Sequence, residues 1–330
     1  MSNTIHVGGA PARGSIAALG FFCAMQALAQ SYPAKPIRLI VGFPPGGSLD
    51  VIARLISPKL SENLGQQVIV DNRSGASGNI AAEVVMNSPP DGYTLLNVTV
   101  PYVVNPYLFS RVPYDARTDF LPVSLLSSSA SLLVVHPSVP ARSVRDLLSL
   151  AKARPGALNY SAAGAGTNPH VAGELFNLLG KVNIVAVQFK GGGPADIAVI
   201  AGEVSISFPN ISQAIGYVSS GRLRALGITS AERAAVLPDL PTIAEGGVPG
   251  YEFTTWHGIL APKGTPRPII VQLNEQIKKT LNAPDQTKLF TERGLSVIAS
   301  TPEQFAAPMV QAEPDPFVRE PLSRPLKTGR

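Results

Sequence analysis

Three glycine-rich turns are the parts of this sequence in which ligand chemistry is expected. They occupy residues 44–48 (PPGGS), 164–168 (GAGTN) and 190–194 (KGGGP), each between a predicted strand and a predicted helix. Glycine lets the backbone approach a ligand closely, and the free N–H groups and positive dipole end of the following helix attract an anion. Any one turn could serve only to connect a strand tightly to a helix. Three of them at the carboxyl ends of strands, where open α/β sheets bind ligands, predict an anion site.

Nucleotide cofactors are not supported by the spacing of these glycines. A phosphate-binding P-loop needs glycine followed by lysine and then serine or threonine, and that tripeptide does not occur in the chain. A dinucleotide fingerprint beginning at Gly164 and Gly166 would need its third glycine at position 169, where Pro169 stands. We therefore predict no cofactor.

Residues suited to catalysis are sparse. Beyond residue 29 the histidines are His136, His170 and His257, without the HExxH spacing of a zinc enzyme, and no G-x-S-x-G serine motif occurs. His170 could act as a general base, although a role in tying its turn to the following helix is favoured. Asp50 could be a catalytic carboxylate, although a favourable charge at a helix N-terminus, or a bond to the 44–48 turn, is favoured. No metal site is predicted.

Alternating strands and helices must position these turns. An apolar, β-branched run at 37–43 predicts a strand, and residues 49–64 have the period of an amphipathic helix with Ser48 as its N-cap. A strand at 67–70, a helix at 79–87 and a strand at 93–98 follow. This alternation requires parallel strands joined by helical crossovers. Residues 101–122 contain four prolines and are predicted to be a connection.

A second alternating set extends from residue 132 to residue 229. Its predicted strands lie at 132–135, 158–161, 184–189, 204–208 and 225–229, and its helices at 144–153 (capped by Ser143), 171–179, 194–201 and 211–219. A strand near 258–261 and helices at 266–281 and 287–293 come after a stretch rich in proline and glycine. The pattern predicts an α/β fold of two lobes, each a mainly parallel sheet flanked by helices.

Composition excludes several classes of protein. The chain has 330 residues, 15% of them charged, and a net charge of +5 at pH 7. An average soluble domain has roughly 25% charged residues, and disordered chains combine high charge with low hydrophobicity, so a folded chain is expected. Lysine and arginine never form a run of four. We therefore expect no nucleic-acid partner.

The first 29 residues are predicted to be a signal peptide. Residues 14–34 carry no charge, residues 15–24 (SIAALGFFCA) are apolar, and Ala27, Leu28 and Ala29 have the small-x-small form of a cleavage site. A membrane anchor is the alternative, but the apolar run is shorter than the roughly 20 residues needed to span a bilayer. Cleavage after Ala29 would remove Cys23, the chain's single cysteine, and would place the mature protein in the periplasm.

Several segments in a fixed order resemble a known family. They are residues 43–83, 88–96 (SPPDGYTLL), 157–176, 187–195 (VQFKGGGPA), 221–252 and 256–266 (WHGILAPKGTP). Over about residues 32–308 the chain resembles the extracytoplasmic solute receptors of tripartite tricarboxylate transporters, the Bug or TctC family. The resemblance implies a two-lobed type II periplasmic-binding-protein fold. Lobe 1 would comprise residues 31–128 and 256–330, and lobe 2 residues 129–255.

The resemblance also implies a function and a site. The receptor would bind a small organic carboxylate between its lobes, through main-chain N–H groups and ordered water at 43–48 and 164–168. It would work as a monomer, not as an enzyme, and deliver the carboxylate to membrane transporter subunits. The expected ligand-binding residues are Phe43, Pro45, Gly46, Gly47, Ser48, Thr99, Gly164, Gly166, Thr167, Asn168, His170, Phe189, Gly191 and Phe208.

The expected ligand has an uncharged body. The three turns contain no acidic side chain, and Pro209 stands where the family usually carries an acidic residue. An unpaired buried charge is costly, so a plain carboxylate should be preferred over its amino-substituted analogue. Asp50 and Asp196, in the first turns of predicted helices, are the acidic residues within reach of the site.

Two other functions remain as alternatives. One is an α/β enzyme that acts on a small carboxylate with His170 as its base. The other is a binding protein of the same fold whose closed form signals through a sensor partner.

Overall fold

The computed structural model describes residues 32–311, together with Met1, Ser2 and Thr4. The predicted signal peptide with its cleavage position after Ala29, and the proline-rich segment after Gln311, lie outside the described residues. Among the described residues, no helix combines the length and the apolar character needed to cross a membrane.

The first sheet begins with the predicted alternation of strands and helices. Its strands β1, β2 and β3 pair in parallel, with β1 between the other two. Helix α2 connects β1 to β2, and a short 3-10 turn followed by α3 connects β2 to β3. The elements are β1 (Ile37–Val41), α2 (Ser48–Leu64), β2 (Val68–Asn72), η2 (Ala76–Gly78), α3 (Asn79–Met86) and β3 (Thr94–Val98). The parallel arrangement expected from the sequence is confirmed here.

Antiparallel strands complete this sheet. Within the described residues its order is β11-β4-β10-β3-β1-β2, and β10 runs antiparallel to both β3 and β4. The added strands are β4 (Phe120–Ala130), β10 (Thr254–Pro262) and β11 (Leu295–Val297). Helices α9 (Arg267–Leu281), α10 (Pro284–Glu292) and α11 (Pro302–Gln311) follow β10 in the chain. The sheet is therefore mixed rather than mainly parallel, because β10 returns from the second sheet in the opposite direction.

The prediction of a connection at 101–122 was wrong. Residues Pro101–Leu108 form helix α4, and β4 starts at Phe120. Proline is accepted at the first helical position, because the N–H that it lacks would have no helical partner there. Strand β4 was missed because serines interrupt the apolar pattern expected of a buried strand. Ser124 and Ser127 are buried, and their hydroxyls bond to the Ser300 carbonyl and to His257 Nδ1.

The second sheet has the order β7-β6-β8-β5-β9 in the described part of the chain. Strand β6 is parallel to β7 and β8, whereas β5 is antiparallel to β8 and β9, so this sheet is mixed as well. Its strands are β5 (Leu132–Val135), β6 (Asn159–Ala162), β7 (Val185–Gln188), β8 (Ile206–Ser207) and β9 (Arg224–Ile228). Its helices are α5 (Val144–Ala153), α6 (Asn168–Gly180), α7 (Gly192–Ile200) and α8 (Ile211–Ser219).

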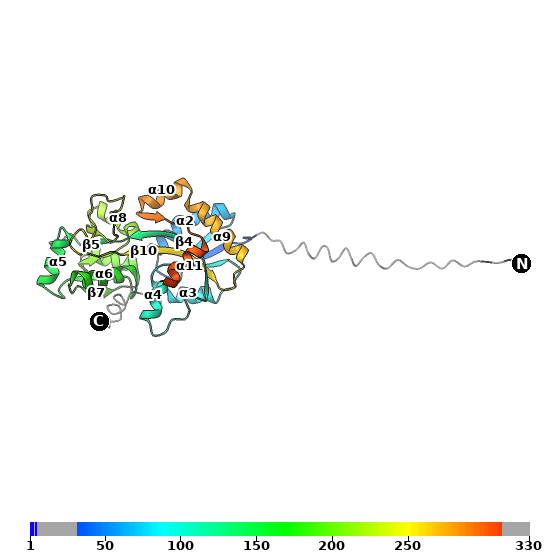
Figure 1. Ribbon diagram of the computed structural model, residues 1–330, viewed down its shortest axis with the longest axis horizontal. Helices are drawn as coiled ribbons and strands as arrows, with labels where there is room; N and C mark the ends of the chain where they lie inside the picture. Colours follow the sequence, from blue (N-terminus) through cyan, green and yellow to red (C-terminus); the bar gives the residue numbers. More distant parts are fainter. Residues whose placement is uncertain (3, 5–31, 312–330) are drawn as a thin grey trace. The chain divides into compact units, whose positions relative to one another are not determined.

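The chain passes between the two sheets twice, and the crossings lie next to each other. Strand β4 leads through Ser131 into β5, and the segment after β9 returns to β10. The Ser131 N–H donates to Thr229 Oγ1 at 2.7 Å, and the Phe253 N–H donates to the Thr229 carbonyl at 2.7 Å. Figure 1 shows β4 and β10 between the elements of the two sheets. The α/β class with two sheets flanked by helices is confirmed.

Candidate ligand-binding site

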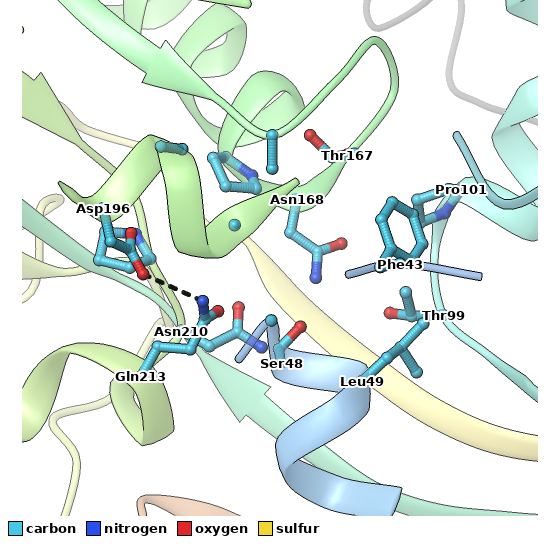
Figure 2. Close-up of a pocket in the computed structure, with 16 residues that line it drawn as sticks. Phe43, Ser48, Leu49, Thr99, Pro101, Thr167, Asn168, Asp196, Asn210 and Gln213 are labelled. Carbon is cyan, nitrogen blue, oxygen red and sulfur yellow. Dashed lines mark hydrogen bonds between the residues drawn. The ribbon is translucent and has the colours of Figure 1, made fainter. Parts of the chain in front are cut away.

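A pocket of about 500 Å³, part of it open to solvent, lies where the helix N-termini of both sheets meet. Figure 2 shows its side chains, with Phe43, Thr99 and Pro101 on one side of the view and Asp196 and Gln213 on the other. The lining consists of Phe43, Gly47, Ser48, Leu49, Thr99, Pro101, Ala163, Thr167, Asn168, Pro169, Gly192, Ala195, Asp196, Pro209, Asn210 and Gln213.

The helices α2, α4, α6, α7 and α8 all contribute residues at or next to their first turn to this lining. The N-caps of four of them, Gly47, Thr167, Gly191 and Asn210, make no side-chain capping bond. By contrast, the cap of α5 is satisfied, as predicted, because Ser143 Oγ accepts the Asp146 N–H at 3.1 Å. Uncapped helix starts leave N–H groups without helical partners and bring positive dipole ends together. The pocket is therefore suited to an anion.

Asp50 holds the turn before α2 rather than lining the pocket. Its carboxylate accepts the Gly46 N–H at 3.0 Å, Arg54 Nε at 3.0 Å and Asn72 Nδ2 at 3.0 Å. Burial alone would raise the pKa of Asp50, but the hydrogen bonds from Arg54, Gly46 and Asn72 outweigh it and lower the pKa. Asp50 is thus ionised, and its carboxylate is occupied by these hydrogen bonds. The prediction of Ser48 as N-cap was wrong, because Gly47 caps α2 and Ser48 is its first residue.

His170 holds the turn before α6. Its Nδ1 accepts the Gly166 N–H at 3.1 Å, and Thr167 Oγ1 donates to the Gly164 carbonyl at 2.7 Å. Burial lowers the pKa of His170 to about 4, so the ring is neutral and can accept this bond. Gly166 has φ +73°, and a Cβ there would lie 2.5 Å from Leu108 Cδ1 of α4. Glycine is therefore required at position 166, both for the positive φ and for the close approach of the turn to Leu108.

Turns from the two sheets contact each other around the pocket. Ser77 Oγ, in the η2 turn of the first sheet, donates to the Ala165 carbonyl of the second at 2.9 Å. Gly191, before α7, has φ +116°, and a Cβ there would lie 2.7 Å from Pro44 Cδ. Turns of the two sheets are therefore in direct contact at the cavity that Pro44, Ser77 and Gly191 line beside the pocket.

The residues expected to bind ligand separate into three groups. Phe43, Gly47, Ser48, Thr99, Thr167 and Asn168 line the pocket. Gly164, Phe189 and Gly191 line a neighbouring cavity that also includes Phe43. Pro45, Gly46, Gly166, His170 and Phe208 lie outside the lining of both.

Phe208 is part of the second sheet's hydrophobic core rather than a pocket wall. It is buried and packs against Tyr160 and Phe176, with ring centroids 6.0 and 5.9 Å away. Phe208 directly follows β8 and belongs to the same core cluster as Ile206, two positions earlier, which is the spacing of side chains on one face of an extended segment.

Sequence reasoning missed several residues that line the pocket. They are Leu49, Pro101, Ala163, Pro169, Gly192, Ala195, Pro209, Asn210 and Gln213. Asn210 could have been found, since asparagine directly before a predicted helix is a typical N-cap. Gln213 carries no comparable signal, because its position depends on how α8 is rotated against the sheet.

Asp196 lies in the pocket, which changes the expected electrostatics. It is 7% exposed, and Gln213 Nε2 donates to its Oδ2 at 3.1 Å, the bond drawn in Figure 2. Burial raises the pKa of Asp196 to about 7, although the Gln213 hydrogen bond works in the other direction. Of the two acidic residues named from the sequence as within reach of the site, Asp196 therefore lines the pocket and Asp50 does not.

Two buried amide groups lining the pocket also lack partners. Among the described residues, nothing hydrogen-bonds to Asn168 Oδ1 or to Asn210 Nδ2. Asn210 is held in place by its other amide atom, Oδ1, which accepts from Ser131 Oγ at 3.2 Å. Buried polar groups are almost always satisfied, so a ligand or water is expected to complete these two. Within the described residues, no group of three or more His, Cys, Asp or Glu side chains could hold a metal ion.

Comparisons with known proteins agree on one family. A family model described as the tripartite tricarboxylate transporter family receptor (TctC) matches residues 52–314. Protein BugT of Bordetella pertussis is 37% identical over 296 residues, which cover 88% of this chain and 91% of BugT. A protein of the UPF0065 group from Pseudomonas sp. strain P51 is 40% identical over 277 residues, covering 84% of this chain and 82% of that protein.

Solved structures show the same likeness. A protein of R. palustris solved with adipate has a TM-score of 0.84 and 36% identity, and the match covers 88% of this chain and 98% of that one. MatC of Rhodopseudomonas palustris, solved with malate, has a TM-score of 0.79 and 32% identity, with 89% and 98% of the two chains covered.

Proposed function

This chain belongs to the family of tripartite tricarboxylate transporter receptors, and on that premise we propose that it is a periplasmic receptor for a small organic carboxylate. The carboxylate binds in the pocket between the two sheets. The receptor then delivers it to the membrane subunits of a transporter. It acts as a monomer.

One observation carries this proposal, namely the meeting of uncapped helix starts at a single pocket. Helices α2, α6 and α7 start at the pocket with free N–H groups, and no lysine or arginine side chain lines the pocket. Such N–H groups bind carboxylates by hydrogen bonding and through the helix dipole, without a salt bridge. The ligands of two related structures, adipate and malate, are both carboxylates and support the same conclusion.

The enzyme alternative has little support in the site. It depends on His170 as a base, yet His170 does not line the pocket, and its Nδ1 already accepts the Gly166 N–H. We retain one alternative output. A receptor that signals through a sensor partner would bind the same carboxylate without supporting its uptake.

A thermal-shift screen of mono-, di- and tricarboxylates tests the proposal. A ligand at 100 times its Kd stabilises the folded state by about 2.7 kcal/mol, which gives a measurable rise in Tm. Uptake of the labelled hit by cells with and without this receptor then separates transport from signalling. No stabilisation by any carboxylate at millimolar concentration would refute the proposal.

Export is tested separately. Periplasmic protein should begin at Gln30 if the signal peptide is cleaved after Ala29, and N-terminal sequencing of the osmotic-shock fraction measures this directly. Full-length chain retained in carbonate-washed membranes would contradict it.

A further inference from the structure

Asp196 is the one titratable side chain among the residues that line the pocket, all of which lie within the described residues. No lysine or arginine in that lining neutralises it. Its recorded side-chain partner, Gln213, is a neutral amide. Ionising a buried carboxylate without a cationic partner is unfavourable, so a cationic group of the ligand would stabilise the ionised form of Asp196.

The unpartnered amide oxygen of Asn168 adds a second acceptor. Asn168 is 5% exposed, lies at the start of α6, and its side chain extends into the middle of the pocket in Figure 2. A ligand made only of carboxylates accepts hydrogen bonds and donates none. It would need a water to satisfy Asn168 Oδ1, and it would place a second negative charge in the pocket that Asp196 lines.

The pocket also contains hydrogen-bond donors. They are the N–H groups of the uncapped helix starts and the unpartnered Nδ2 of Asn210. The pocket therefore offers donors for a carboxylate and, in addition, an anionic acceptor and a neutral acceptor for a donor group.

We propose that the ligand is an amino acid, with an ammonium group that binds Asp196 while its carboxylate binds the N–H groups of the helix starts. The inference rests on the proposed function and narrows its substrate class. Asp196 becomes the residue that determines specificity for the amino group. The proposal reverses the prediction, made from the three turns alone, that the preferred ligand has an uncharged body.

The state of Asp196 makes this specificity dependent on pH. With its pKa raised to about 7 by burial, Asp196 is mostly protonated at pH 6 and mostly ionised at pH 8. Strands β6 and β8 pack against α7, Gln213 of α8 bonds to Asp196, and the start of α2 lies next to Gly192. The other titratable residues of these elements and of the segments flanking α7 all lie outside the pocket lining. They are Tyr160 of β6, Asp50, Arg54, Lys59 and Glu62 of α2, Tyr217 of α8, Lys190 and Glu203. If an ammonium binds the ionised form alone, its affinity should be about tenfold higher at pH 8 than at pH 6.

Matched ligand pairs test the proposal by calorimetry on the purified full chain. The pairs are succinate with aspartate, glutarate with glutamate, and valerate with norvaline, which differ only in the amino group. We expect the amino-substituted member to bind at least tenfold more tightly in the pairs that bind. Malate, with a neutral hydroxyl donor on the succinate skeleton, should bind more weakly than aspartate because it leaves Asp196 unneutralised.

Two variants locate the effect. Asp196→Asn keeps the side-chain shape and removes the charge, so the preference for the amino member and its pH dependence should both disappear. Glu203→Gln removes the same charge from an exposed residue beyond the end of α7 and should leave both unchanged.

Each result counts for or against the proposal. Plain carboxylates that bind as tightly as their amino analogues in every pair, or a preference that survives in Asp196→Asn, would overturn it and leave the proposed function standing. Binding of neither class would overturn the proposed function and this inference together.

Discussion

Replacing Ser48 by proline should remove one N–H group from the anion site without disturbing helix α2. Ser48 is the first residue of α2, where proline is favoured. Gly47 before it has φ −75° and ψ 165°, the extended conformation that a following proline requires. The substitution therefore deletes the donor and retains the backbone path. Ser48→Ala is the matched control, because it removes the hydroxyl and keeps the N–H.

The expected magnitude follows from the charge of the ligand. A hydrogen bond to a charged group contributes roughly 1.5–3 kcal/mol. Each 1.4 kcal/mol changes affinity tenfold, so Ser48→Pro should weaken binding by about 10- to 150-fold relative to Ser48→Ala. The Tm of the free protein should stay within a few degrees of that of the control, since this N–H has no intrahelical partner.

Isothermal titration calorimetry with the tightest ligand from the screen measures the effect, and a thermal melt of each variant confirms folding. Equal Kd values for Ser48→Pro and Ser48→Ala in two equally stable proteins would refute the reasoning. In that case the first N–H of α2 does not bind the ligand, and the anion site must lie elsewhere.

Two further predictions concern the free protein and its closure. Because the pKa of Asp196 is raised from 3.8 to about 7, the folded state keeps a proton that the unfolded chain releases, so Asp196 contributes a loss of stability of up to about 4 kcal/mol as pH rises from 4 to 7. The buried His170 and His257, whose pKa values are lowered, contribute in the opposite direction but equally in the wild type and in Asp196→Asn. The urea-unfolding free energy of the wild type minus that of Asp196→Asn should therefore fall between pH 4.5 and pH 8, and a difference that is constant with pH would contradict the prediction. Gly166→Val should prevent the α6 turn from packing against Leu108, because a Cβ there lies 2.5 Å from its Cδ1 and φ is +73°. Small-angle scattering should then show no ligand-induced compaction in Gly166→Val, whereas compaction equal to that of the wild type would argue against the contact.

Local sequence signals were enough for the elements that depend on near neighbours. The alternation of apolar periods placed β1, α2, β2, α3 and β3, and the Ser143 cap of α5 was visible because its partner lies three residues away. The glycine turns at 44–48, 164–168 and 190–194 could be recognised as possible anion sites for the same reason. Glycine content and a following helix are properties of adjacent residues.

Pairing between distant segments could not be predicted in the same way. Strand β4 carries serines at buried positions, and their hydroxyls are satisfied by Ser300 and His257, more than a hundred residues away. Helix α4 was hidden by its prolines, which a helix accepts only at particular positions. The antiparallel strands that make both sheets mixed depend on these long-range contacts.

The composition of the pocket was decided by tertiary structure alone. Whether Asp50 or Asp196 faces the ligand depends on how each helix is rotated on its sheet, and both residues look alike in sequence, each in the first turns of a helix. The Asp50 carboxylate accepts hydrogen bonds from Arg54, Asn72 and the Gly46 N–H and does not line the pocket. Asp196 lines the pocket and accepts a hydrogen bond from Gln213 of a different helix. The sequence by itself determined that glycine-rich turns at 44–48, 164–168 and 190–194 lead into helices, and it predicted an anion site from them. Only the packing of α7 against β6 and β8, with Gln213 of α8 bonded to Asp196, determined that a buried acidic group lines the pocket, because rotation about a helix axis is set by contacts between elements and not by the residues of the helix alone.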